Sequence, residues 1–440
     1  MRILENCRVP LCVIPEAERA GLPVMDAELD PLVAVCIEIR DGRVERLWPG
    51  PRATEVPGGH AVENLDGSVV TPRLVDAHVH LDKAHTWDRA PNRSATFAEA
   101  IETLGRDKEN WTEEDLYRRA NYAMACAYAH GTTAVRTHVD TGLPWAETSH
   151  RVMAALREEW KERILLQTVS LCGVDQYAGP EGAALADLPV RHGAVALGGM
   201  PLMNPELPRQ LDAMLSLALD RQVGIDLHVD ESGDAGALTL LAVAEAVLRN
   251  RFPYPVTCGH ACSLAVQDEA TTETVIRRVR EAGIRIISLP LCNLYLQDRS
   301  AGRTPRWRGI TLLNEWQRAG VLTACASDNV RDAFYAYGDL DAFEVLLAGI
   351  RIGHMDNDLL HAPELVTTAP GQIMGLAGHG WLAPGAPARL IAFAGRSFSE
   401  WLSRPTQSRR LFEYDRWLEP TVPPYPILSR HHEAEGAHPS

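Results

Sequence analysis

From residue 69 onward, short apolar segments alternate with longer amphipathic ones. Eight of the apolar segments have the length and β-branched content of buried strands, and they cover residues 69–80, 132–140, 163–171, 193–200, 223–230, 253–260, 284–290 and 321–328. The segments between them, such as 147–163 and 204–222, carry apolar residues at helical spacing. Strand and helix alternating eight times predict the α/β class and a closed, parallel (β/α)8 TIM barrel.

The two ends of the chain follow a different pattern. Residues 33–48, VAVCIEIRDGRVERLW, predict a β-hairpin with its turn at Asp41-Gly42, and GAPARLIAFAG at 385–395 returns to a strand pattern. We expect residues 1–68 and 380–425 to form one small β-sandwich domain, and residues 69–379 to form the catalytic barrel. The polar residues 426–440 predict a disordered tail, in which His431 and His432 are solvated rather than ligands.

Histidines and acidic residues gather where four predicted strands end, which is the face on which a barrel builds its site. They are His78 and His80, His228 and Glu231, His260, and Asp328. His78 and His80 are two positions apart on one strand, so both imidazoles would point into the same cavity.

Each of these residues alone has an ordinary structural explanation. A lone histidine at a strand end more often makes a structural hydrogen bond, Glu231 could be a solvated charge, and Asp328 could cap a helix. Together they predict a metal site, because imidazoles and a carboxylate hold a divalent ion while leaving a position for water. A bound ion would lower the pKa of that water to about 7. Asp328 could accept its proton, and Glu231 could act as general acid and base.

The same pattern resembles the amidohydrolase superfamily, and within it the bacterial cytosine deaminase type. The matching stretches, in chain order, are HVHLD (78–82), VRTHVD (135–140), DLHVDE (226–231), NLYLQDR (293–299), RWRGIT (306–311) and DAFYAYGD (332–339). The resemblance implies hydrolytic deamination of a small amino-substituted heterocycle, cytosine or a close analogue, with release of ammonia.

The resemblance also assigns expected roles. It makes His78, His80, His228 and Asp328 the ligands of one zinc or iron ion, Glu231 the proton shuttle, and His260 the residue that orients the attacking water. The fourth strand ends in GGMPLMN (198–204), without the lysine that bridges a second metal ion in dinuclear relatives, so one ion is expected. Asp82 and His138 would orient the ligands, and Lys83 has no expected catalytic role.

The expected substrate contacts are Leu81, Gln176, Asn329 and Phe334. The glutamine that reads the pyrimidine edge in the deaminase type falls at Gly173 here, and Gln176 either replaces it or is an ordinary solvated residue. Asn329 stands where the family has a second aspartate. Phe334 stands at a tryptophan position, where it would form an apolar wall or pack in the core.

The stretch CASDN (325–329) also resembles isopropylammelide hydrolase, which removes an alkylamine from a triazine ring and lacks the glutamate found here at Glu231. Release of an alkylamine, or opening of a cyclic amide, is therefore the alternative activity. A non-catalytic barrel would have lost ligands or the glutamate, and this chain has retained both.

Composition narrows the partners. The formal net charge of −15 argues against nucleic acid and anionic membranes, and no apolar run is long enough to span a bilayer. The N-terminal MRILENCRVPLC lacks the apolar core of a secretory signal, and nine cysteines without CxxC pairs are typical of reduced thiols, so we expect a cytoplasmic enzyme. Cys258 and Cys262 are expected in the core. Barrels of this kind commonly associate, so a homo-oligomer stays an open expectation.

Overall fold

The computed structural model describes residues 1–26, 29–50, 61–94 and 96–429. The chain divides into two compact units: Met1–Asp76 with Gly131–Ala134 and Ala342–Pro420, and Ala77–His130 with Val135–Asp341 and Thr421–Ser440. This division does not test the predicted domain boundaries, which stay a prediction. Within the predicted tail, Pro426–Ser429 form the short helix α14, and residues 430–440, with His431 and His432, lie outside the described residues.

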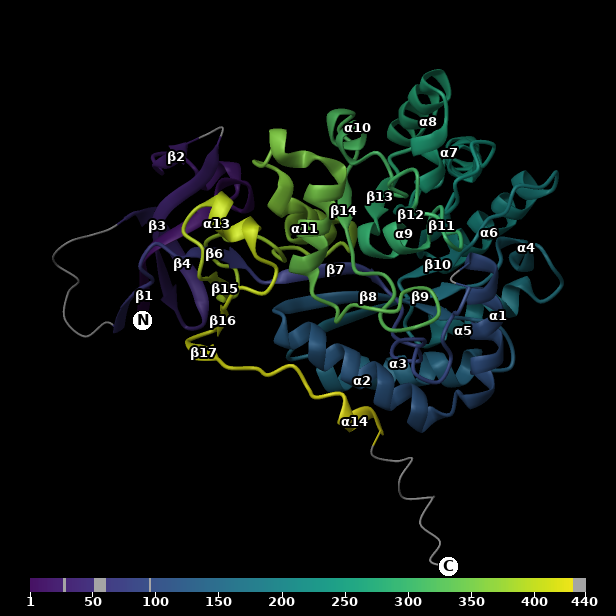
Figure 1. The fold of residues 1–440 in the computed structure, drawn as a ribbon, viewed down its shortest axis with the longest axis horizontal. Coiled ribbons are helices and arrows are strands. Elements are labelled where there is room, and N and C mark those ends of the chain that lie inside the picture. Colours follow the sequence, from purple (N-terminus) through teal and green to yellow (C-terminus); the bar gives the residue numbers. More distant parts are fainter. Residues whose placement is uncertain (27–28, 51–60, 95, 430–440) are drawn as a thin grey trace, which may run out of the picture. The chain divides into compact units, whose positions relative to one another are not determined.

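Eight parallel strands form one sheet in sequential order from β7 to β14 (Figure 1). They are β7 (Leu74–Val79), β8 (Thr132–Asp140), β9 (Leu165–Leu171), β10 (Ala196–Gly199), β11 (Gly224–Val229), β12 (Val256–His260), β13 (Arg285–Ser288) and β14 (Thr323–Cys325). A parallel bridge between Val79 and Asp328 joins the last strand back to the first, and the Asp328 N–H donates to the His78 carbonyl at 2.9 Å. The predicted α/β barrel is confirmed.

The first predicted strand, residues 69–80, is two strands. β6 (Val69–Pro72) pairs with β15 (Arg389–Phe393) in a different sheet, and β7 begins only at Leu74. Pro72 has no N–H to continue a ladder, and the N–H of Arg73 donates to the Arg389 carbonyl at 3.0 Å. The strand pattern of residues 69–80 does not by itself reveal such a change of partner.

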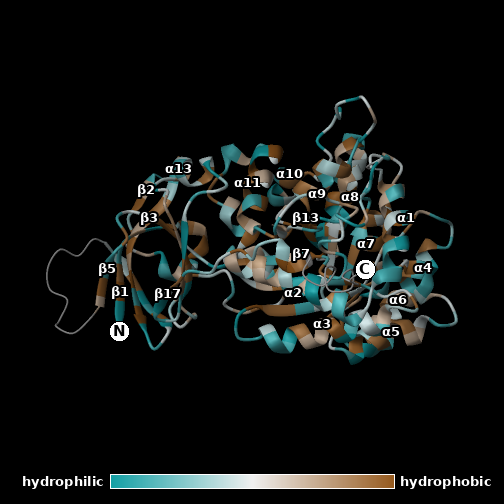
Figure 2. Cartoon of the chain, turned by 60° about the horizontal axis from the view of Figure 1, so that its bottom comes forward, coloured by the Kyte–Doolittle hydropathy of each residue, from teal (hydrophilic) through white to brown (hydrophobic). Residues whose placement is uncertain are grey.

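The helices that follow the barrel strands in sequence are amphipathic. They are α1 (Phe97–Asp107), α2 (Glu113–Ala129), α3 (Ala146–Trp160), α4 (Val174–Tyr177), α5 (Gly182–Arg191), α6 (Leu207–Arg221), α7 (Thr239–Asn250), α8 (Glu269–Glu281), α9 (Pro290–Leu296) and α10 (Leu313–Arg318). Figure 2 shows α3, α5 and α6 banded in hydrophilic and hydrophobic colours, as expected of helices with one buried face. None of the helices in the described residues is long and apolar enough to cross a membrane.

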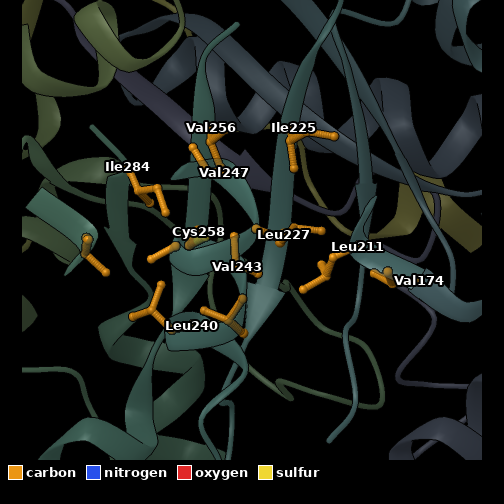
Figure 3. Packing of buried hydrophobic residues seen from close by; sticks show 14 of the residues in the cluster. Val174, Leu211, Ile225, Leu227, Leu240, Val243, Val247, Val256, Cys258 and Ile284 are labelled. Atoms are coloured by element: carbon orange, nitrogen blue, oxygen red, sulfur yellow. The ribbon is translucent and has the colours of Figure 1, made fainter. Parts of the chain in front are cut away.

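Alternation along the strands separates core from site. Ile225 and Leu227 of β11 pack with Val256 of β12 and with Val243 of α7 in one apolar cluster (Figure 3). The residues of β11 that alternate with Ile225 and Leu227, including His228, therefore point to the other face of the sheet, into the barrel. Cys258 is fully buried in the same cluster, and Cys262 is also fully buried.

The first unit contains a nine-stranded sheet made from both ends of the chain. Its strands are β1 (Arg2–Pro10), β2 (Val24–Asp26), β3 (Asp30–Arg40), β4 (Arg43–Pro49), β5 (Ala61–Asn64), β6, β15, β16 (Arg409–Glu413) and β17 (Arg416–Leu418), and its helices are α11 (Ala342–Gly353), α12 (Thr368–Ile373) and α13 (Phe398–Ser403). β3 and β4 form the predicted hairpin, with positive φ angles of 51° at Asp41 and 74° at Gly42.

Candidate active site

Three histidines and one aspartate converge at the carboxyl ends of β7, β11 and β14. His228 Nε2 lies 3.1 Å from His78 Nε2 and 3.2 Å from His80 Nε2. Asp328 Oδ1 lies 3.2 Å from His80 Nε2 and 3.6 Å from His78 Nε2. A tetrahedral zinc site with bonds of about 2.1 Å places its ligand atoms about 3.4 Å apart. The four atoms therefore fit around one divalent ion.

The three imidazoles are suited to donate lone pairs. Burial lowers the pKa of His78, His80 and His228 well below the usual value, and neighbouring histidines and Lys83 lower it further. The rings therefore stay neutral near pH 7 and keep a nitrogen lone pair. Neutral imidazole is the form that binds a metal ion.

Backbone turns in the left-handed region bring two of the site residues inward. His260 has the same parity as Val256 and Cys258, which pack outside the barrel, so a regular strand would direct its side chain away from the site. Positive φ angles of 71° at His260 and 50° at Ala261 break the alternation, and His260 lies close to His78 and His228. Asp328 has a φ of 65°. Such conformations are uncommon for non-glycine residues and cluster at functional sites.

Glu231 contacts both His260 and the end of β14. Its Oε1 lies 3.3 Å from His260 Nδ1, and its carboxyl group lies close to Asp328 and Cys292. Burial raises the pKa of Glu231 well above its usual value, and the charge of Asp328 raises it further. Both effects favour the protonated carboxyl group, which is the form that a general acid needs.

Asp230, which precedes Glu231, has a structural role. Its carboxylate accepts from the N–H groups of Thr239 at 2.8 Å and Leu240 at 2.9 Å, at the first turn of α7. Its φ of 48° turns the chain out of β11. The start of α7 and the turn before Glu231 are thereby joined through one side chain.

His138 and Asp82 were expected to orient the ligand imidazoles, but their contacts are of another kind. The ring of His138 lies against the ring of His78, with centroids 4.0 Å apart. Asp82 Oδ2 accepts from the Asp140 N–H at 2.7 Å and so joins the loop after β7 to the end of β8. The hydrogen bonds among the described residues connect neither side chain to a ligand imidazole.

A cavity of about 370 Å³ opens beside the histidines. This volume is typical of small-molecule sites. Gln176, Asn329 and Phe334 line it together with His80, His228, Glu231, His260 and Asp328. Leu81, expected to contact substrate, is absent from the lining: it is fully buried in the core, and its N–H donates to Thr137 Oγ1 at 3.0 Å.

One wall of the cavity was not anticipated. Phe97, Ile101 and Leu104 of α1 line it, and Lys108 follows on the same helical stripe. Asp140 also lines the cavity and lies between two lysines, 3.2 Å from Lys83 Nζ and 2.9 Å from Lys108 Nζ. The spacing of four, three and four residues along this stripe indicates an amphipathic helix, but it does not predict which cavity the helix face lines.

Asn329 is held from two sides. Its Nδ2 donates to Asp332 Oδ2 at 2.6 Å, and the thiol of Cys292 approaches its Oδ1 at 3.6 Å. Asp332 in turn accepts from the N–H groups of Phe334 and Tyr335. The amide at position 329 thus has a set orientation beside the cavity. Asp332 belongs to the stretch 332–339 that carries the family resemblance, whereas Cys292 was not singled out from the sequence.

Comparison with known proteins agrees with this architecture. The profile described as "Amidohydrolase family" matches residues 113–409. A pterin deaminase from Rhizobium rhizogenes is 44% identical over 397 residues, which cover 90% of each protein. The N-isopropylammelide isopropyl amidohydrolase of a Pseudomonas species is 25% identical over 78% of this chain and 84% of that protein.

The solved structures include a 5-methylcytosine deaminase from Klebsiella pneumoniae with bound 5-fluorocytosine. It matches with a TM-score of 0.80 and 25% identity over 94% of this chain and 97% of that one. Both the profile and the pterin deaminase match cover most of the chain. The resemblance predicted from the residue pattern is therefore confirmed: the chain belongs to the amidohydrolase family and is a hydrolase of C–N bonds.

Proposed function

We propose that His78, His80, His228 and Asp328 hold one divalent ion, zinc or iron, and that this site hydrolytically deaminates a small heterocycle. The observation that carries the proposal is that His228 Nε2 and Asp328 Oδ1 each lie 3.1–3.6 Å from the Nε2 atoms of His78 and His80, with the buried carboxyl group of Glu231 beside them. Imidazole nitrogen and carboxylate oxygen suit zinc and iron alike. When bound, such an ion would make water a nucleophile near neutral pH.

The chain's own residues supply the proton transfers. Water attacks the ring carbon that carries the amine, and Asp328 accepts a proton from it. Glu231 donates its proton to the neighbouring ring nitrogen, and His260 hydrogen-bonds the attacking water. A C–O bond forms, Asp328 returns its proton to the amine nitrogen, and ammonia leaves as the C–N bond breaks. The hydroxyl proton of the intermediate passes to Glu231, which restores that group, and the ring keeps a carbonyl. One water molecule is consumed for each ammonia released.

Three side chains of the cavity support an amino-oxo-pyrimidine edge as the recognised group. A Cβ on Gly173 would meet the Asp175 carboxylate first and would lie 3.5 Å from Gln176 Nε2, so the Gln176 amide borders the space beside residue 173. Gln176 is thus placed to replace the glutamine of the cytosine deaminase type. Asn329 offers a further donor and acceptor, and Phe334 forms an apolar wall beside Phe97.

The substrate that we propose first is a pterin, which contains such an edge within a fused ring. The 44% identity to a pterin deaminase over 90% of the chain supports it. Cytosine or 5-methylcytosine is the second candidate, supported by the similarity to the Klebsiella enzyme. Either reaction releases ammonia.

The test measures ammonia release by metal-loaded protein from pterin, cytosine, 5-methylcytosine and N-isopropylammelide, together with Glu231→Gln. We expect ammonia from pterin, and a fall in kcat of at least about 100-fold in Glu231→Gln, because general acid–base catalysis contributes about 10²–10⁴-fold. Isopropylamine from the triazine, without ammonia from any ring, would replace the proposal by the alkylamine-releasing activity of the Pseudomonas relative.

A further inference from the structure

Asn293, in the first turn of α9, contacts both residues that we propose to act on the attacking water and the ring. Its Nδ2 lies 3.0 Å from His260 Nδ1 and 3.3 Å from Glu231 Oε1. Asn293 is fully buried, and its backbone N–H donates to the Leu289 carbonyl at 3.0 Å. The helix therefore fixes the backbone of Asn293, and burial restricts the rotation of its side-chain amide.

The second contact of α9 restrains the backbone of the same partner. Gln297, one turn later, donates from Nε2 to the Glu231 carbonyl at 3.2 Å. Glu231 is thus restrained at its backbone by Gln297 and at its carboxylate by Asn293. Two side chains of one short segment therefore set where the proton carrier lies.

The chemistry of the three groups determines how the amide must face. Glu231 Oε1 accepts hydrogen bonds, and an amide nitrogen has two hydrogens, so the nitrogen can satisfy both the carboxylate and the imidazole. With the transferable proton on the other oxygen of Glu231, the opposite orientation would place the amide oxygen against an unprotonated Oε1, and the two oxygens would repel each other. With Nδ2 donating to it, His260 Nδ1 carries no hydrogen, and the hydrogen of the neutral ring lies on Nε2.

This tautomer separates His260 from the three ligand histidines. His260 belongs to the same cluster of nitrogens as His78 and His228, and its Nε2 is buried without a hydrogen-bond partner in the described residues. A nitrogen that carries hydrogen cannot bind a metal ion, but it can donate to water. The Glu231 oxygen that does not face Asn293 stays available to carry the transferable proton.

We propose that Asn293 is a positioning residue that fixes the Nε2–H tautomer of His260 and the orientation of the Glu231 carboxyl group. The inference rests on the proposed function, in which these two residues serve the attacking water and the ring nitrogen. Asn293→Asp is the sharpest change, because it is nearly isosteric but accepts at the atom that faces His260 Nδ1. It should draw a hydrogen to Nδ1.

The first measurement is the histidine tautomer in metal-free protein labelled with ¹⁵N-histidine, read from long-range ¹H–¹⁵N correlations and assigned with His260→Gln. We expect the Nε2–H form in the wild type, the Nδ1–H or doubly protonated form in Asn293→Asp, and a mixture of both tautomers in Asn293→Ala. An Nδ1–H or doubly protonated His260 in the wild type would overturn the proposal, as would an unchanged tautomer in both variants. Asn293→Ala keeps the test open if Asn293→Asp does not fold.

The second measurement is steady-state deamination of the substrate found in the panel. Asn293→Asp should lower kcat about 100-fold while KM changes less than about 3-fold, because the affected groups act on the reacting atoms. The matched control is Asn121→Asp on α2, whose oxygen accepts from Trp160 Nε1 at 2.8 Å in a place remote from the cavity. It should leave kcat and the tautomer unchanged, and an equal loss in both variants would overturn the proposed role.

The two measurements separate this inference from the proposed function. The tautomer is observable in a protein that deaminates none of the compounds tested. A tautomer that switches in Asn293→Asp supports the positioning role even if the substrate assignment fails. A fixed tautomer refutes the role even if deamination is demonstrated.

Discussion

At the scale of single residues, a substitution of Gln176 tests whether this side chain helps to bind the substrate. Its amide lies near Gly173, and both residues line the cavity. We expect Gln176→Leu to lower kcat/KM for ammonia release about 10-fold, the cost of one lost hydrogen bond of about 1.4 kcal/mol. Gln317→Leu on α10 is the control. Equal kinetics in wild type and Gln176→Leu would show that Gln176 is an ordinary polar wall residue.

At the scale of elements, a partly buried ion-pair cluster joins α2 to the loops around α1. Arg89 forms hydrogen bonds with both Asp107 at the end of α1 and Asp115 in α2, the shortest of them 2.7 and 2.6 Å. Arg119 bonds Asp115 at 2.9 Å and the carbonyls of residues 82 and 84 at 2.7 and 2.9 Å. The cluster thereby holds the segment after His80 and the helix that forms the cavity wall.

The cluster predicts a pH dependence of stability. Burial by itself would raise the pKa of Asp115, but the hydrogen bonds and charges of Arg89 and Arg119 outweigh it and lower that pKa to about 2. Because this lies below the unfolded value of about 3.9, the ionised carboxylate stabilises the fold above pH 4 and loses its contribution as the pH falls toward 2.

Asp115→Asn should therefore lower the free energy of unfolding by about 2 kcal/mol at pH 7, with the deficit shrinking between pH 4 and pH 2. Urea unfolding of both proteins across this pH range measures it. The exposed pair Lys161–Glu158, at 3.2 Å, offers Glu158→Gln as a control that should cost little at any pH. A deficit that stays constant down to pH 2 would contradict the explanation.

At the scale of the whole molecule, the proposed four-ligand site would couple metal binding to folding, because its residues come from segments as far apart as positions 78 and 328. A ligand that binds only the folded state at about 100 times its Kd contributes about 2.7 kcal/mol. We expect chelation to lower the Tm by about 3 °C and one equivalent of zinc or iron to restore it. His80→Asn should melt at one temperature with and without chelator. A wild-type Tm that is the same with and without chelator would contradict the proposed site.

Part of the site was predictable because its signals are local. Residues two apart on a strand share a face, so spacing alone assigns His78 and His80 to one cavity, and strand ends identify His228 and Asp328. His260 was correctly predicted at the end of its strand, but strand spacing does not explain why its side chain faces the site. That direction depends on the φ angles of 71° and 50° at residues 260 and 261. Leu81 was expected at the cavity and lies in the core.

The sequence by itself determined the class of fold, the order of the barrel strands and the kinds of chemical group at their ends. These follow from periodicity and from neighbours along the chain, which are local properties. Only the tertiary structure decided that β6 leaves the barrel sheet, that α1 walls the cavity, that Gln176 lines the same cavity, and that Asn293 contacts both Glu231 and His260. Each of these depends on how separate segments pack against one another, and the spacing of residues within one segment carries no information about that.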